Sequence, residues 1–174
     1  MQIKTVHYER LFTIGNYQNE KIGFSADLDK HDDAEAILGQ LFGKVTESQH
    51  FLCIFRNAID EEEYMSQRID RQKARVANTE QQIQQMKISM TELAEKLQKG
   101  TGDVDDHLRH ACTGTSLKDL TAQLGRERQH LRDLLTQEEK LHEFILEINN
   151  RIGTGNFSPI GLSIPRMQPS VYEG

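Results

Sequence analysis

Basic side chains recur at helical spacing in two separate stretches of the sequence, and their chemistry suits phosphate binding. The first stretch holds Arg68, Arg71, Lys73 and Arg75, and the second holds Arg126, Arg128 and Arg132. A guanidinium group donates paired hydrogen bonds to phosphate oxygens, so arginines that converge from several subunits would form one anion pocket. The alternative interpretation is a solvated coiled-coil face, because Glu and Asp are interleaved with these cations.

A second group of candidate ligand-binding residues lies near the N-terminus. It comprises His7, Tyr8, Arg10, Asn16, Tyr17 and Asn19. Aromatic and cationic groups on a sheet can stack bases and hold phosphates. Strand alternation places Tyr8 and Arg10 on one face and His7 and Glu9 on the other; ordinary strand packing is the competing interpretation. From the two groups together we predict that the ligand-binding residues are Tyr8, Arg10, Asn16, Tyr17, Arg68, Arg71 and Arg75.

Potential metal ligands gather between the two basic stretches. His107, His110 and Cys112 lie beside Asp103, Asp105 and Asp106. A His-x-x-His spacing puts two imidazoles on one helical face, as zinc sites require. Structural zinc needs four ligands, however, and only three strong ones are clustered here. These residues are therefore weak candidates; a polar turn of helix is the favoured interpretation, and no metal or cofactor is predicted.

The acidic run at residues 60–63 is interpreted as the start of a long helix, where carboxylates offset the macrodipole. A divalent-cation site is the alternative. The sequence contains no P-loop and no G-x-G-x-x-G, G-x-S-x-G or H-E-x-x-H motif. We predict no catalytic residue, and a binding protein is favoured over an enzyme.

The elements that must position these residues begin with two strands within residues 2–28. Residues 3–12 are rich in β-branched and aromatic side chains, and residues 20–28 alternate between apolar and polar. Residues 15–19 suit a turn, because Gly and Asn tolerate positive φ. A two-stranded hairpin is marginal in water, so it needs a helix or a second hairpin against its apolar face.

An amphipathic helix is the expected cover for this hairpin. Asp32 and Glu35 have the spacing of a capping box, and apolar residues then recur at helical spacing as far as Val45. The apolar run at residues 51–55 fits either a third strand or the end of this helix. Periodicity alone does not decide between the two.

Two apolar seams with alternating spacings of three and four residues are the strongest pattern in the chain. The first consists of Met65, Ile69, Gln72, Val76, Thr79, Ile83, Met86, Met90, Leu93 and Leu97. The second consists of Leu117, Leu120, Leu124, Glu127, Leu131, Leu134, Glu138, Leu141, Ile145, Ile148 and Ile152. Both predict long helices whose seams pack together.

The segment between the seams is predicted to reverse the chain. Gly100 and Gly102 suit a helix stop, and Ser116 with Asp119 suits a new N-cap. Arms of nearly equal length on either side should fold back as an antiparallel pair. Off-seam apolar side chains at Leu135, Phe144 and Leu146 lead us to expect homo-oligomerisation through this helical hairpin.

The predicted fold class is therefore α+β, with three parts. A β-hairpin and helix domain covers residues 1–59. An antiparallel coiled-coil hairpin covers 60–152 with its connector at 99–116. An extended tail covers 153–174, where all the prolines lie among apolar residues, and it is expected to dock on its own fold or on a neighbour.

Composition supports a long helical protein rather than an enzyme with a thick α/β core, since 36% of residues are hydrophobic and 28% are charged. The net charge of -6 argues against bulk attraction to nucleic acid. No apolar run approaches the roughly 20 residues of a membrane span, and charged residues interrupt any N-terminal signal. Cys53 and Cys112 form no CxxC pair. We expect a cytoplasmic protein with no membrane partner, in the host cytoplasm if the chain is phage-encoded.

Residues 4–22 resemble the opening of a set of short bacteriophage, prophage and bacterial proteins. Their pattern reads K-T-V-x-Y-x-R-L-x-x-L-G-N-Y-E-N-x-x-I; here Ile14 replaces the usual Leu and Gln18 the usual Glu. The resemblance covers about the first 45 residues and implies a phage-related origin. It carries no established catalytic motif.

In size and layout the chain is also similar to phage anti-defence sponges. Those are small oligomers, with a sheet followed by helices, that sequester nucleotide immune signals such as cyclic ADP-ribose isomers. The similarity implies a binding role and transfers no ligand-binding residue, because no motif aligns.

These observations lead to one functional prediction and one alternative. We expect a non-catalytic homo-oligomer that holds a nucleotide-type anion or a short single-stranded nucleic acid at subunit interfaces, with sequestration of an immune signal as one use. The alternative is a structural coiled-coil adaptor that spaces or scaffolds protein partners.

Overall fold

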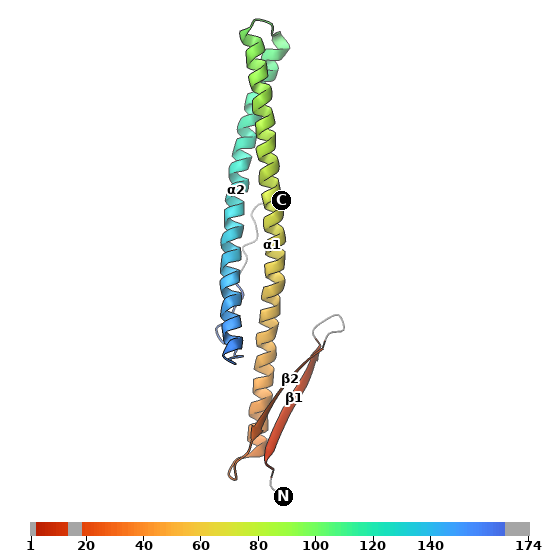
Figure 1. The fold of residues 1–174 in the computed structure, drawn as a ribbon, viewed down its shortest axis with the longest axis vertical. Helices are drawn as coiled ribbons and strands as arrows, with labels where there is room; N and C mark the ends of the chain where they lie inside the picture. The colour runs from red at the N-terminus through yellow and green to blue at the C-terminus, as the bar shows by residue number, and fades with distance from the viewer. Residues whose placement is uncertain (1–2, 14–18, 166–174) are drawn as a thin grey trace. The chain divides into compact units, whose positions relative to one another are not determined.

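The computed structural model describes residues 3–13 and 19–165 as four elements in the order strand, strand, helix, helix. The strands are β1 (Thr5–Thr13) and β2 (Asn19–Asp27), and the helices are α1 (Ala34–Gln98) and α2 (Val104–Gly153) (Figure 1). The α+β class is confirmed: an antiparallel β-hairpin precedes two long helices that pack against each other.

The chain divides into two compact units. The first combines the hairpin, α1 as far as Glu61, and the chain from Leu141 through the end of α2 into the tail. The second contains the remainder of the two helices, from Glu62 to Lys140, with the connector between them.

In the first unit, β1 and β2 pair antiparallel with Tyr8 opposite Phe24 and Arg10 opposite Ile22. Phe12 on the same face as Tyr8 is buried, and the Tyr8 ring meets Phe42 of α1 edge-on at 5.5 Å between centroids. The other face is polar: Glu9 accepts from Lys21 at 2.7 Å and contacts His7 at 3.1 Å. The predicted alternation is confirmed, and α1 covers the apolar face.

The α1 helix begins one residue later than its capping signal suggested. Oδ1 of Asp33 accepts the backbone N–H groups of Glu35 and Ala36 at 2.9 and 3.4 Å, so Asp33 is the N-cap. The Asp32 carboxylate is used elsewhere, because it accepts the N–H of Asp29 at 2.7 Å in the preceding turn.

Residues 51–55 are helical, which settles the choice that the sequence left open. The α1 helix runs without a break for 65 residues, and Leu41, Val45, Phe51 and Ala58 are buried along it. The interpretation of residues 60–63 as a helix start is therefore wrong. Those carboxylates lie in the middle of α1, far from the N-terminal dipole that they were expected to offset.

The tail after α2 folds back on the first unit. Gly155, at a φ of 70°, ends the helix in a Schellman arrangement: its N–H bonds to Ile152 at 3.0 Å, and the N–H of Asn156 bonds to Arg151 at 2.8 Å. Phe157 then meets Phe51 edge-on at 5.7 Å.

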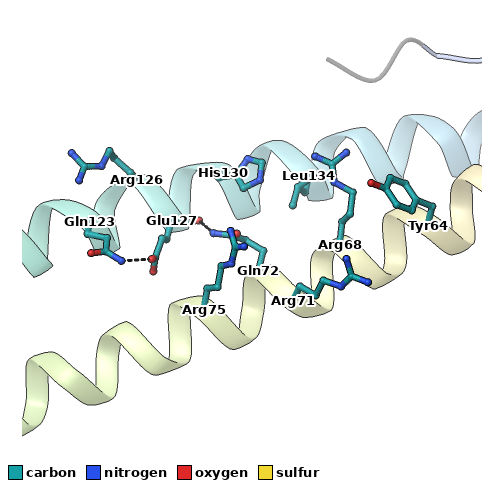
Figure 2. A pocket seen from close by; sticks show the side chains of 10 residues that line it. All are labelled: Tyr64, Arg68, Arg71, Gln72, Arg75, Gln123, Arg126, Glu127, His130 and Leu134. Carbon is teal, nitrogen blue, oxygen red and sulfur yellow. Dashed lines mark hydrogen bonds between the residues drawn. The ribbon is translucent and has the colours of Figure 1, made fainter. Parts of the chain in front are cut away.

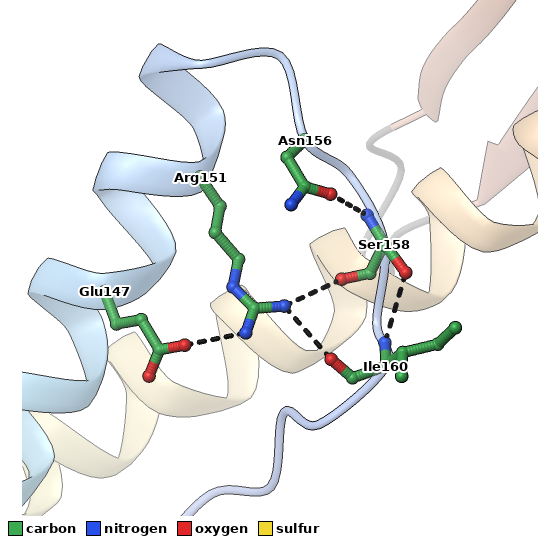
Figure 3. Close-up of polar contacts among 5 residues, drawn as sticks. All are labelled: Glu147, Arg151, Asn156, Ser158 and Ile160. Carbon is green, nitrogen blue, oxygen red and sulfur yellow. Dashed lines mark hydrogen bonds and ion pairs between the residues drawn. The ribbon is translucent and has the colours of Figure 1, made fainter.

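The side chain of Arg151 holds this tail in place through hydrogen bonds to the tail backbone. Its Nη1 donates to the carbonyl oxygens of Ser158 and Ile160 at 3.2 and 3.1 Å, while its Nη2 pairs with Glu147 at 2.7 Å (Figure 3). Docking of the tail on its own fold is thus observed as far as residue 165; the rest of the predicted segment lies outside the described residues.

In the second unit the two predicted seams face each other. Met65, Ile69 and Leu134 form a buried cluster, against which Leu131 packs. Gln72 and Thr79, the two polar members of the first seam, are also buried. Nε2 of Gln72 donates to the backbone carbonyl of Glu127 at 3.0 Å, which satisfies a buried amide across the helix pair.

The connector is much shorter than the predicted 99–116. Gly100, at a φ of 70°, closes α1: its N–H bonds to Leu97 and that of Thr101 to Lys96, both at 3.1 Å. Asp103 then caps α2, accepting the N–H of Asp106 at 2.8 Å. This capping box starts the helix well before Ser116, because Gly114 is accommodated inside a helix whose seam is buried.

Truncating a buried seam residue should destabilise the protein far more than truncating an exposed residue of the same type. Ile69 is 2% exposed and Ile88, on the same helix, is 52% exposed. We expect Ile69→Ala to lower the free energy of unfolding by about 2–4 kcal/mol. Ile88→Ala should change it by no more than about 0.5 kcal/mol. Denaturant titrations followed by circular dichroism measure both, and equal losses would contradict the observed seam.

Candidate anion-binding site

A cavity of about 450 Å³ opens between α1 and α2 in the second unit (Figure 2). It is lined by Tyr64, Arg68, Arg71, Gln72, Arg75, Gln123, Arg126, Glu127, His130 and Leu134. Leu134 belongs to the apolar cluster beside it, so the cavity is an interruption of the helix seam rather than a separate cleft. We call it the arginine pocket.

Helix geometry brings the basic residues of the arginine pocket together. Arg68, Arg71 and Arg75 are spaced by three and four residues, which places them on one side of α1. Arg126 and His130 are four apart on α2 and supply the opposite wall. Figure 2 shows the three α1 arginines projecting from one helix while His130 projects from the other.

The arginine pocket is strongly positive although the chain as a whole is negative. Four guanidinium groups and one carboxylate line it, whereas the whole sequence carries a formal charge of -6. Within the described part of the chain, Arg71, Arg75 and Arg126 have neither an ion pair nor a hydrogen bond. Figure 2 shows Arg126 pointing away from α1, whereas Arg71 and Arg75 both project from α1, so these two like charges repel each other and an anion would relieve that repulsion.

Other basic residues of the same stretches are engaged outside the pocket. Arg128 pairs with Glu80 at 2.6 Å, Arg132 donates to Gln129 at 2.6 Å, and Lys73 lies 3.7 Å from Asp70. For these three, the alternative interpretation of a balanced, solvated helix face describes what the structure shows.

Two uncharged features complete the walls. Tyr64, which is 49% exposed, lies at one end with the guanidinium carbon of Arg68 5.7 Å from its ring centroid. At the other end, Nε2 of Gln123 donates to Oε1 of Glu127 at 2.7 Å. The second carboxylate oxygen of Glu127, Oε2, is buried and has no hydrogen-bond partner among the described residues.

The structure brings together only part of the predicted ligand-binding set. Arg68, Arg71 and Arg75 share the arginine pocket. Tyr8 and Arg10 belong to the first unit, where Tyr8 packs on Phe42 and the Arg10 guanidinium lies 5.5 Å from the Phe12 ring centroid. The predicted Asn16 and Tyr17 lie outside the described residues, and the side chain of Asn19 is likewise not described.

The metal candidates are not assembled into a site. Among residues 3–13 and 19–165, no group of three or more His, Cys, Asp or Glu side chains is placed to hold a metal ion. Asp103 and Asp106 are engaged in capping α2, and both Cys53 and Cys112 are exposed free thiols.

Seven pocket residues were missing from the predicted set: Tyr64, Gln72, Gln123, Arg126, Glu127, His130 and Leu134. A signal for two of them was present in the sequence. Gln72 and Glu127 are polar residues at seam positions, where leucine would pack better, and they turn out to face the same cavity from opposite helices. Polar breaks in two seams that pair are therefore a usable marker of such a pocket.

Comparisons with protein-family models, with curated proteins and with solved structures found no match for this chain. The phage-related origin inferred from residues 4–22 therefore stays a prediction. In the described part of the chain, neither helix contains a stretch apolar enough to cross a membrane.

Removing one of the converging charges should not weaken the fold. We expect Arg75→Gln to leave the thermal midpoint unchanged or to raise it, with a larger gain at low salt, because it relieves repulsion among the pocket arginines. The matched control Arg128→Gln breaks the pair with Glu80 and should lose up to about 0.5 kcal/mol. Scanning calorimetry at two salt concentrations measures both variants. A larger loss for Arg75→Gln would show that this arginine is structural.

Proposed function

We propose that this protein binds and holds a phosphorylated, nucleotide-type anion in the arginine pocket. The position of Arg68, Arg71 and Arg75 on one side of α1 along the pocket carries the proposal, because Arg71 and Arg75 have no ion pair or hydrogen bond among the described residues. A protein of net charge -6 has little reason to leave Arg71 and Arg75 in one cavity without carboxylate partners unless an anion binds there.

The size and chemistry of the pocket support a small ligand. Its volume of about 450 Å³ lies within the range of small-molecule sites. Arginines recognise phosphate oxygens by paired hydrogen bonds, and Tyr64 offers an aromatic face at the pocket end for a ring. Sequestration of a nucleotide signal, as in the phage sponges that the chain resembles in layout, is one use of such binding.

The site differs from the sequence-based expectation in one respect. Arginines from several subunits were expected to converge at an interface, whereas the arginine pocket is built from two helices of a single chain. Binding therefore needs no second copy. This separates the ligand proposal from the oligomer proposal, and each has its own test.

Replacing pocket arginines should abolish binding while replacing neighbouring arginines should not. The test pair is Arg71→Gln with Arg75→Gln, and the control pair is Arg128→Gln with Arg132→Gln, which removes the same charge outside the pocket. Charge-assisted hydrogen bonds contribute roughly 1.5–3 kcal/mol each. The pocket variant should thus bind ADP and pyrophosphate at least about 100-fold more weakly by titration calorimetry.

Three outcomes would count against this proposal. Equal losses in both double variants would mean that bulk charge, and no defined pocket, attracts the anion. Tight binding of an oligonucleotide, with an affinity that falls steeply as salt rises, would indicate that the protein binds single-stranded nucleic acid instead. If no phosphorylated probe binds, the alternative hypothesis of a structural adaptor for protein partners would remain.

The expected homo-oligomerisation through the helical hairpin has its own support in exposed apolar side chains. In the second unit, Val104 and Leu108 are 84% and 63% exposed, and Ile88 and Leu135 are also exposed. Exposed apolar residues mark a surface that binds another chain where they form a contiguous patch, and substitution of the off-seam Leu135 tests for one. We propose that a second copy of this protein covers part of this surface.

Introducing a charge at Leu135 should break such an assembly. We expect the wild-type protein to have a mass in light scattering that is a multiple of 20.0 kDa, and Leu135→Glu to shift it toward one copy. Thr136→Glu, on the next exposed position, serves as the control. A wild-type mass of one copy would refute the oligomer and would leave the arginine pocket intact, because its residues come from one chain.

A further inference from the structure

The carboxylate of Glu127 is the one negatively charged group among the ten residues that line the arginine pocket. It lies in the wall opposite Arg75 and Gln72, on α2 (Figure 2). A carboxylate in a phosphate site weakens binding of a bare anion through like-charge repulsion. Its presence therefore selects against ligands that consist of phosphate alone.

The hydrogen bonds of Glu127 leave most of its acceptor capacity unused. An ionised carboxylate offers about four acceptor positions. Only the Gln123 amide uses one of these, at Oε1, and Oε2 is buried without a partner among the described residues. A buried acceptor with no donor is costly, and native proteins seldom retain one without a role.

A donor that enters the pocket can reach this carboxylate. Gln123, which donates to Oε1, is exposed, and Glu127 lines the cavity as a half-buried residue, so part of Glu127 is accessible from the pocket. The final torsion of glutamate is broad and roughly two-fold, so rotation of the carboxylate exchanges its two oxygens at low cost. A ligand donor can bind once the carboxylate turns its unpartnered oxygen toward the pocket.

We propose that Glu127 accepts a hydrogen bond from a ribose hydroxyl, so that the pocket takes ribonucleoside phosphates in preference to deoxyribonucleotides and bare pyrophosphate. This inference rests on the proposed function. A ribose hydroxyl is a neutral donor close to the phosphates that the arginines hold, whereas a base edge lies farther from those phosphates. The arginines hold the phosphates and Tyr64 is available to the base.

Titration calorimetry with a matched set of probes tests this assignment. The probes are the four ribonucleoside diphosphates, their 2′-deoxy and 3′-deoxy forms, and inorganic pyrophosphate. The wild-type protein should bind at least one ribonucleoside diphosphate about tenfold or more tightly than pyrophosphate and one of its deoxy forms, because loss of the hydroxyl leaves a buried acceptor unpaired.

The variant Glu127→Leu should erase this preference. Leucine fits the seam position, so the helix pair is expected to stay folded, and removal of the carboxylate should leave pyrophosphate binding equal or tighter. The ribose and deoxyribose forms should then bind alike. Glu139→Leu, at an exposed position of the same helix, should keep the wild-type preference.

The outcomes separate this inference from the function on which it rests. Equal affinity of the wild-type protein for pyrophosphate, ribose and deoxyribose probes would overturn the role of Glu127 while supporting the arginine pocket. A ribose preference that survives Glu127→Leu would likewise overturn it. Failure of all probes, pyrophosphate included, would overturn the pocket and the inference together.

Discussion

The pairing of α1 with α2 along one apolar seam is the constraint on which the described site depends. In the second unit, Met65, Ile69 and Leu134 are almost completely buried. Their burial must offset the conformational entropy of ordering two long helices, so the rotation of each helix about its axis is fixed by its seam. Once that rotation is fixed, the face of the helix pair on which each flanking side chain lies is fixed as well. Arg68, Arg71 and Arg75 consequently lie beside the seam, opposite Gln123 and Glu127.

The arginine pocket exists because the seam is imperfect. Gln72 and Glu127 occupy positions where two leucines would pack. Instead, the Gln72 amide donates to the backbone carbonyl of Glu127, and Oε2 of the Glu127 carboxylate has no hydrogen-bond partner among the described residues. Converging cations add repulsion to that cost. Local choices that weaken a fold without compensation elsewhere are typical of functional sites, where ligand binding supplies the missing interactions. The neighbouring Arg128, with its Glu80 partner, shows the ordinary surface arrangement that Arg71 and Arg75 lack among the described residues.

Local pattern predicted the strands, their faces and both seams, but it misplaced several boundaries. Asp33 and not Asp32 caps α1, because adjacent aspartates offer the same capping chemistry and only backbone geometry selects one. Residues 51–55 are helical: buried Phe51 continues the face of α1 that holds Val45 and Ala58, a fact that a short apolar run cannot reveal. The sequence predicted a start of the second helix at Ser116, because Gly114 was interpreted as a helix break. The structure starts α2 at the capping box of Asp103 and Asp106, and Gly114 lies inside the helix.

The sequence by itself determined which residues are helical seam, which strand face is apolar and that the chain must reverse near Gly100, because these depend on periodicity and on the conformations that single residues allow. The membership of the pocket was decided only in three dimensions. A connector of 99–116 would have moved the pairing of the helices by more than three turns of about 3.6 residues, and Arg75 would then face the region of Lys140 instead of Glu127. The tight turn at residues 99–103 sets the register of α1 against α2, and register is a relation between two helices that no pattern within either one contains.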